Sequence, residues 1–330
     1  MKNHTNAGGD AAVQESTELT KKYLRFPPPY RRIARLNRLT YSIAGLFLFP
    51  VFWLLAYTLK TPGLNLRIKF AKRGAALLLK GDYTRAHGLL VAPLDSVRYF
   101  EFEFMWNAVR TLRPTSYLDV SSPRMLPLMI LEQYKDLVAD LVNPDKSDLP
   151  ETQHFAELFK LTHRCRFHEQ LIEEAPLQSN SFSLITSMSV VEHIPDDTGA
   201  IQKMWDLLEP GGMLLLSVPC AAKASEEYTN LNDYGLIEKD ESGFVFWQRY
   251  YDESLLQQRI FNITGLPIKR LIYAEKKAGL YNQNVEQKRS NPYYPSWREP
   301  WMMGQEFVFK EAIEELPGMG VIAMEFIKPR

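Results

Sequence analysis

The stretch that decides the fold spans residues 181–218. It contains the segments 181–185 (SFSLI), 192–194 (EHI) and 209–218 (EPGGMLLLSV). Two apolar runs, each next to turn-forming residues, enclose a helical pattern at 200–208. A strand, a helix and a second strand joined by short turns are typical of one βαβ unit in a parallel sheet. We therefore expect such a unit in this part of the chain.

The same alternation of strand and helix continues on both sides of this unit. Upstream, a helical pattern at 125–134 separates two apolar runs, and downstream a helical pattern at 254–263 precedes another. The expected strands are 116–120, 137–142, 182–187, 213–218, 267–274 and 320–327. Strands separated by helices predict an α/β fold with a doubly wound, mostly parallel sheet.

Composition limits the classes of function that fit the chain. It has 330 residues with 39 basic and 39 acidic side chains, so its overall charge gives no sign of nucleic-acid binding. Its two cysteines, Cys165 and Cys220, form neither a disulfide framework nor a zinc-binding spacing. This usage favours a reducing compartment, and we expect no nucleic-acid partner.

The N-terminal third differs in character from the rest of the chain. Residues 1–20 are polar and lack apolar periodicity, so we expect a disordered tail there. Residues 21–96 are expected to form a basic and apolar helical extension. Between Lys21 and Lys80 there are 13 basic residues and no acidic ones.

Residues 41–59 are uncharged and largely apolar, and membrane contact is the interpretation that we favour. At 1.5 Å per residue such a helix reaches roughly 28 Å, close to the roughly 30 Å of a hydrocarbon core. Three arrangements fit: a single span, an in-plane or re-entrant helix kinked at Pro50, and a helix buried against the rest of the protein. Basic residues at both ends favour the in-plane helix, on the cytoplasmic side of a membrane.

A further helix is expected over residues 66–79. Apolar residues recur on one side of it, and Arg67, Lys69, Lys72 and Arg73 lie largely on the other. A basic amphipathic helix of this kind suits a membrane surface or a solvated outer layer.

The segments 181–185, 192–193 and 209–212 resemble the fourth and fifth strands of class I S-adenosylmethionine-dependent methyltransferases, in the type 11 or quinone-methyltransferase-like subgroup. The resemblance implies a Rossmann-like sheet of seven strands in a methyltransferase domain at 97–330, with an insertion around 275–318. It also implies S-adenosylmethionine as the cofactor and methyl transfer as the reaction. Because the family's glycine-rich loop is altered here, a catalytically inactive binding or scaffold protein is the alternative.

The cofactor site is expected beyond the carboxyl ends of the strands. After the first strand the resemblance places Asp119 and a loop in which Ser121 and Pro123 replace glycines, with Ser122 between them. After the second it places Asp140, 21 residues beyond Asp119, where the family has its ribose-binding acid. The other expected cofactor-binding residues are Gln170, Leu171, Ser187 and Met188.

Candidates for catalysis follow the fourth strand and lie in the aromatic segment 243–252. Glu192 and His193 can serve as a structural pair, as a general base or as part of a metal site, although no metal is expected. We assign the catalytic role to His193 and Tyr250. Aromatic residues here and at 293–297 favour a hydrophobic, lipid-linked or glycan acceptor, but an ordinary hydrophobic lid has the same composition.

Overall fold

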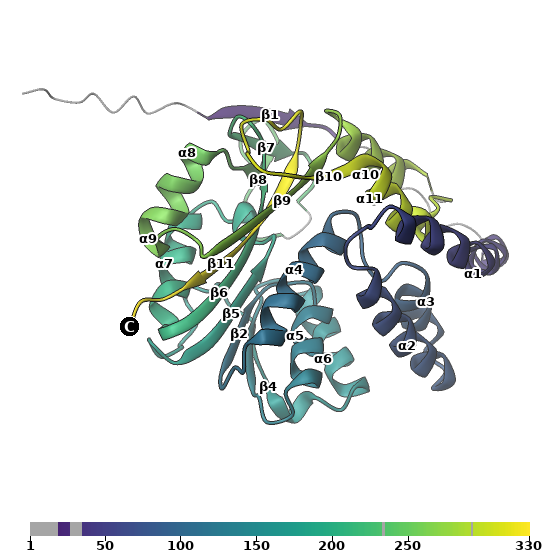
Figure 1. Ribbon diagram of the computed structural model, residues 1–330, viewed down its shortest axis with the longest axis horizontal. Coiled ribbons are helices and arrows are strands. Elements are labelled where there is room, and N and C mark those ends of the chain that lie inside the picture. The colour runs from purple at the N-terminus through teal and green to yellow at the C-terminus, as the bar shows by residue number, and fades with distance from the viewer. Residues whose placement is uncertain (1–18, 27–34, 233–234, 292) are drawn as a thin grey trace, which may run out of the picture.

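The computed structural model describes residues 19–26, 35–232, 235–291 and 293–330 (Figure 1). Within these residues the main sheet has eight strands. They are β2 (Tyr117–Val120), β3 (Ala139–Val142), β4 (Cys165–His168), β5 (Phe182–Met188), β6 (Leu208–Cys220), β9 (Lys269–Glu275), β10 (Phe307–Lys310) and β11 (Gly320–Ile327). Their order across the sheet is β10-β9-β11-β6-β5-β2-β3-β4.

The expected doubly wound, mostly parallel sheet is confirmed. β2 pairs in parallel with β3 and β5, β3 with β4, and β5 with β6. β11 runs antiparallel to β6 and β9, and β10 runs antiparallel to β9. The sheet has eight strands instead of the expected seven because the segment 275–318 contributes β10 at the edge. The direction of winding reverses between β2 and β5, which is where such sheets bind ligands.

Helices cover both faces of the main sheet (Figure 1). One face carries α4 (Arg98–Thr111), α5 (Met125–Gln133) and α6 (Asp148–Leu158), and the other carries α7 (Asp197–Leu207) and the helical residues 253–264. Successive residues of a strand point to opposite faces. Accordingly, Leu184 of β5 belongs to one hydrophobic cluster and Ile185 to another. Helices on both faces explain why β5 and the second half of β6 are buried at every residue.

A smaller sheet lies beside the main one and contains β1 (Thr20–Leu24), β7 (Ser225–Thr229) and β8 (Val245–Tyr250), in the order β1-β7-β8. The prediction of a helical extension from residue 21 is therefore wrong at its start. β1 pairs in parallel with β7, more than 200 residues away, and this partner cannot be read from a short basic segment. The expected tail at 1–20 lies outside the described residues except for Leu19 and Thr20.

Three helices follow: α1 (Arg35–Thr58), α2 (Leu64–Leu79) and α3 (Tyr83–Val91). Residues 41–59 thus fall almost entirely in α1. Among the helices that the structure describes, none is both long and apolar enough to cross a membrane.

The segment 275–318 contains α10 (Leu280–Ser290), the short 3-10 helix Ser296–Arg298, α11 (Glu299–Glu306) and β10. α1 packs against this segment (Figure 1). Gly45 permits the close approach, because a Cβ atom there would lie 2.8 Å from Cε3 of Trp297.

Arg67 in α2 corrects the expected amphipathic pattern. Its side chain is fully buried instead of facing outward. One guanidinium nitrogen donates to the Val91 carbonyl at 2.6 Å, the other donates to the Tyr99 hydroxyl, and the group lies 4.2 Å from the ring centre of Phe49. These partners replace water, so the structure uses Arg67 to join α1, α2 and α4.

Candidate active site

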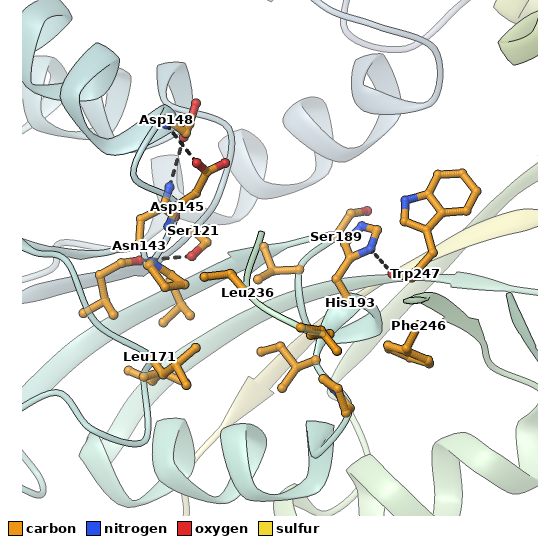
Figure 2. Close-up of a pocket in the computed structure, with 18 of the residues that line it drawn as sticks. Ser121, Asn143, Asp145, Asp148, Leu171, Ser189, His193, Leu236, Phe246 and Trp247 are labelled. Atoms are coloured by element: carbon orange, nitrogen blue, oxygen red, sulfur yellow. Dashed lines mark hydrogen bonds between the residues drawn. The ribbon is translucent and has the colours of Figure 1, made fainter. Parts of the chain in front are cut away.

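A cavity of about 640 Å³ lies beyond the carboxyl ends of β2, β3 and β5 (Figure 2). Its volume is in the range of small-molecule sites. The polar end is lined by Ser121, Arg124, Asn143, Asp145 and Asp148. The aromatic end is lined by Ile194, Leu231, Leu236, Ile237, Val245, Phe246 and Trp247. Arg98, Met188, Ser189 and His193 also line the cavity.

Hydrogen bonds among its own side chains fix the polar end. Asn143 Oδ1 accepts from the Asp145 backbone amide at 2.9 Å, and Asn143 Nδ2 donates to Asp148 Oδ2 at 3.0 Å (Figure 2). Asp148 also forms an ion pair with Arg124. The loop after β3 therefore presents amide and carboxylate groups in a fixed arrangement at the strand end.

Ser121 occupies the position of the first missing glycine and keeps a glycine-like backbone. Its φ angle is +51°, in the left-handed region that residues other than glycine seldom adopt. Its backbone amide and its hydroxyl both donate to the Val142 carbonyl, at 2.9 and 3.2 Å. Ser121 therefore adopts a backbone conformation that glycine would adopt without strain.

Asp119 lies beneath this loop and does not line the cavity. Its Oδ1 accepts from the Thr186 hydroxyl at 2.6 Å and from the Tyr117 hydroxyl at 3.2 Å, and its Oδ2 accepts from the Ser122 amide at 3.1 Å. Burial raises the pKa of Asp119 to about 6. Asp119 therefore holds the turn from below instead of contacting a ligand in the cavity.

Asp140 was expected to bind the ribose, but it too does not line the cavity. The Asp140 carboxylate is buried and bonds to two side chains of β4, with His168 Nε2 at 2.8 Å and Arg166 Nη1 at 3.1 Å. Asp140 stands in the middle of β3, and the residues that reach the cavity follow the strand end. Asn143 and Asp145, which follow β3, line the cavity instead.

The remaining predicted residues divide in the same way. Ser121, Leu171, Met188 and His193 line the cavity, whereas Ser122, Gln170, Ser187 and Tyr250 do not. Gln170 is exposed to solvent and Ser187 is fully buried in β5. The Tyr250 hydroxyl accepts from Gln248 Nε2 at 2.9 Å within a buried network. Tyr250 is therefore not placed to contact a substrate in the cavity.

His193 faces the cavity in a neutral form at pH 7. Its Nδ1 lies 2.5 Å from the backbone oxygen of Trp247, and because a carbonyl can only accept, Nδ1 carries the proton (Figure 2). Burial lowers the pKa of His193 to about 4. A neutral imidazole protonated at Nδ1 has Nε2 as its proton-accepting atom.

A buried charged cluster adjoins His193. Arg98 Nη1 donates to Glu101 Oε2 at 3.1 Å and to the Met188 carbonyl at 3.3 Å, and the Ser217 hydroxyl donates to Glu101 Oε1 at 2.6 Å. Burial raises the pKa of Glu192 to about 8, so this carboxyl is mostly protonated at pH 7. In the described part of the chain, no group of three or more histidine, cysteine or acidic residues is arranged to hold a metal ion.

Comparison with known proteins gives the family. Residues 129–216 match a protein family described as a methyltransferase domain. Residues 129–216 of this chain therefore form a methyltransferase domain. The chain is 32% identical over 119 residues to a ubiquinone biosynthesis O-methyltransferase of Xanthomonas oryzae pv. oryzae, which covers 34% of this chain and 49% of the relative. A relative of that name from Xanthomonas axonopodis pv. citri is 42% identical over 52 residues, or 16% of this chain and 22% of the relative.

The chain spans about half the length of the Xanthomonas oryzae relatives that it matches. Two solved structures are similar at lower identity. Geranyl diphosphate C-methyltransferase from Streptomyces coelicolor A3(2) has a TM-score of 0.46 at 8% identity, covering 74% of this chain and 78% of that one. The YcgJ protein from Bacillus subtilis has a TM-score of 0.45 at 16% identity, covering 70% and 99%.

The cofactor of the methyltransferase domain is S-adenosylmethionine. The cavity fits this cofactor in volume and in chemistry. Asn143 and Asp145 offer amide and carboxylate groups to hydroxyl groups, and Leu171 offers an apolar surface beside them. The left-handed turn at Ser121 lets the backbone lie along the cavity wall where the family has glycine.

Proposed function

We propose that this protein transfers a methyl group from S-adenosylmethionine to a hydrophobic acceptor bound at the aromatic end of the cavity. One observation carries the proposal: a single cavity joins a polar end at the carboxyl ends of β2 and β3 to an aromatic end lined by β8 and by Leu231, Leu236 and Ile237. A cofactor and an acceptor can share such a cavity without water between them. Alignment of the two reactants accounts for much of the rate in reactions of this type.

The cofactor would occupy the polar end. Asn143 and Asp145 would bind the ribose hydroxyls, Leu171 would contact the adenine base, and the turn at Ser121 would border the methionine part. When bound, S-adenosylmethionine supplies an electrophilic methyl group. The chain's own residues then orient the cofactor and exclude water.

His193 is the residue we assign to proton transfer. Its neutral imidazole lines the cavity beside Trp247, whose carbonyl fixes its orientation through Nδ1 (Figure 2). Nε2 would accept the proton of an acceptor hydroxyl as the new oxygen–methyl bond forms. Tyr250 drops out of this proposal because its hydroxyl lies in the buried network with Gln248.

The acceptor would be apolar next to the group that is methylated. Phe246 and Trp247 provide aromatic surfaces, and Leu231 and Leu236 add aliphatic ones. The named relatives are ubiquinone biosynthesis O-methyltransferases, so a ring hydroxyl on a lipid-linked molecule is the acceptor that we favour over a glycan. A lipid-linked acceptor also implies contact with a membrane through residues 21–80, on its cytoplasmic side.

A non-catalytic binding or scaffold protein is the second candidate. The loop after β2 favours it, because Ser121 and Pro123 replace glycines. The glycine-like backbone of Ser121 argues for the enzyme instead.

Calorimetric titration of the full chain with S-adenosylmethionine and S-adenosylhomocysteine separates the two candidates. We expect micromolar binding, followed by methyl transfer to a phenolic acceptor that carries an apolar tail. A folded protein that binds neither compound would contradict the enzyme and support the scaffold. Binding without transfer to any phenolic, lipid or glycan acceptor would leave the cofactor site intact and contradict the proposed acceptor.

A further inference from the structure

The helix α1 presents a broad apolar face to the outside of the protein. The side chain of Phe47 is 77% exposed and that of Leu54 is 59% exposed. The exposed apolar residues of this face are Ile43, Phe47, Leu48, Val51, Leu54 and Leu55. Positions 43, 47, 51 and 54 follow the helical repeat, so they form one continuous stripe along α1. We call this stripe and its two flanking leucines the α1 face.

The opposite side of α1 is fixed to the rest of the protein. Ala56 is fully buried, Gly45 abuts Trp297, and the rings of Phe52 and Trp301 lie 5.5 Å apart between centres. These contacts fall along much of the helix. They hold α1 in one rotational setting, so the α1 face points outward as part of the folded structure.

The charges around α1 indicate what this face contacts. Residues 40–59 contain no charged side chain, whereas Lys60 directly follows and Lys72 in α2 is exposed. From residue 21 to residue 80 every formally charged side chain is basic. A helix with an apolar face and basic flanks binds in the plane of an anionic membrane, with the apolar face at the boundary between headgroups and acyl chains.

A second copy of the chain fits this surface less well. Two α1 faces in contact would bring two basic segments together, and residues 21–80 offer no acidic partner in either orientation of the helices. Like charges brought together disfavour such a dimer. An anionic leaflet supplies the missing negative charge and the apolar phase at once.

We propose that the α1 face inserts into one leaflet of an anionic membrane, with α1 parallel to the surface and its opposite side still packed on the segment 275–318. This inference deepens the membrane contact in the proposed function and identifies the face that makes it. It does not depend on methyl transfer. An acceptor with a lipid tail would then reach the protein from the same membrane leaflet that holds its tail.

Sedimentation with vesicles tests the inference on the full-length chain. The vesicles are phosphatidylcholine alone, or phosphatidylcholine with about one third phosphatidylglycerol. We expect binding to the anionic vesicles and at least about tenfold weaker binding of the double variant Phe47→Ser/Leu54→Ser, because two exposed apolar side chains lose their contact with the acyl region. The matched control is Leu266→Ser, since Leu266 is 73% exposed in the loop before β9.

Each outcome decides the inference. Anionic binding that the double variant loses and Leu266→Ser keeps supports the α1 face. No binding of the wild type to either vesicle, or equal loss in both variants, overturns it. A wild-type dimer in analytical ultracentrifugation that the double variant dissociates, without vesicle binding, also overturns it in favour of a second copy.

Calorimetric titration with S-adenosylmethionine accompanies these measurements. The double variant should bind the cofactor as the wild type does, because neither residue lines the cavity. Loss of vesicle binding with unchanged cofactor binding therefore concerns the α1 face alone. Failure of the wild type to bind the cofactor would contradict the proposed function and leave the inference about the α1 face unchanged.

Discussion

The two ends of the cavity are built by different parts of the fold. The polar end consists of loops that directly follow β2 and β3, so its position is fixed by the sheet that the whole family shares. The aromatic end comes from β8 of the small sheet β1-β7-β8 and from Leu231, Leu236 and Ile237, which follow β7 in the chain. The difference teaches that the main sheet positions the polar end and the additional sheet positions the aromatic end; in the proposed function the first would hold the cofactor and the second would select the acceptor.

The largest effect is expected at Glu192, a buried residue next to His193 in the chain. Its pKa is raised to about 8, so ionising it in the folded protein costs stability as pH rises from its ordinary value of 4.5 through 8. We expect Glu192→Gln to remove this cost. Between pH 6 and pH 9 the free energy of unfolding of the wild type should fall by about 3 kcal/mol relative to the variant, measured by urea denaturation.

This pH range avoids the two other shifted groups of the site. Burial lowers the pKa of His193 to about 4, so this residue lowers the free energy of unfolding as pH falls from about 6.5 toward 4. Asp119 has a pKa of about 6 and contributes mainly between pH 4 and 6. Parallel stability curves for the wild type and Glu192→Gln above pH 6 would show that Glu192 is not protonated in the folded state.

The substitution Asn143→Leu tests the role of the polar end. This change removes the hydrogen bonds that Asn143 makes with Asp145 and Asp148, and places an apolar group beside the ribose. We expect the dissociation constant of S-adenosylmethionine to rise at least about tenfold in calorimetry, because an unsatisfied polar group costs about 1–3 kcal/mol.

The matched control for Asn143 is Asp140→Asn, in a side chain that the sequence favoured and the structure places outside the cavity. It should weaken the contacts to Arg166 and His168 and reduce stability, with cofactor affinity changed less than twofold. If Asp140→Asn weakened cofactor binding more than Asn143→Leu does, Asp140 would again be the residue assigned to the ribose.

The aromatic end can be broken separately by Trp247→Ala. Truncating this ring removes apolar surface from the acceptor pocket, so KM for the acceptor should rise by roughly tenfold while cofactor affinity is unchanged. The backbone carbonyl that orients His193 remains in the variant.

Tyr250→Phe should leave kcat close to the wild-type value, and a loss of more than tenfold there would return Tyr250 to the catalytic role.

The smallest effect is expected at Ser121. Ser121→Gly relaxes the left-handed backbone but loses the hydroxyl bond to Val142, so stability should change by less than about 1 kcal/mol. Ser121→Val forces a β-branched side chain into the same conformation and should cost about 1–3 kcal/mol. Thermal denaturation of the two variants compares them, and equal stabilities would mean that the turn is not constrained.

The sequence predicts the parts of the fold that rest on local patterns. β5 and β6 are long apolar runs, and the expected strands at 182–187 and 213–218 are confirmed. β4 was missed because Cys165–His168 is short and half polar. β1 was missed because its strand conformation depends on a distant partner, β7.

The site follows the same distinction. Ser121 and Met188, which were predicted from their place at strand ends, line the cavity, but a sequence does not give the residue at which a strand ends. That register decides between Asp140, which points to β4, and Asn143, which lines the cavity. The sign that could have found Asn143 is its position before Pro144, since proline has no N–H to donate to a strand ladder and so marks the end of a strand inside a sheet.

The pairing of β1 with β7 also bears on the order in which the molecule assembles and comes apart. Its contacts join residues such as Thr20 and Ser225, and the amide of Phe26 donates to Asn230 Oδ1, 204 residues further along the chain. Closing so long a loop is slow, and most of β1 is exposed to solvent. We therefore expect β1 to dock last during folding and to exchange its amide hydrogens before the main sheet does. Transient release of this strand would loosen the aromatic end of the cavity while the polar end stays closed.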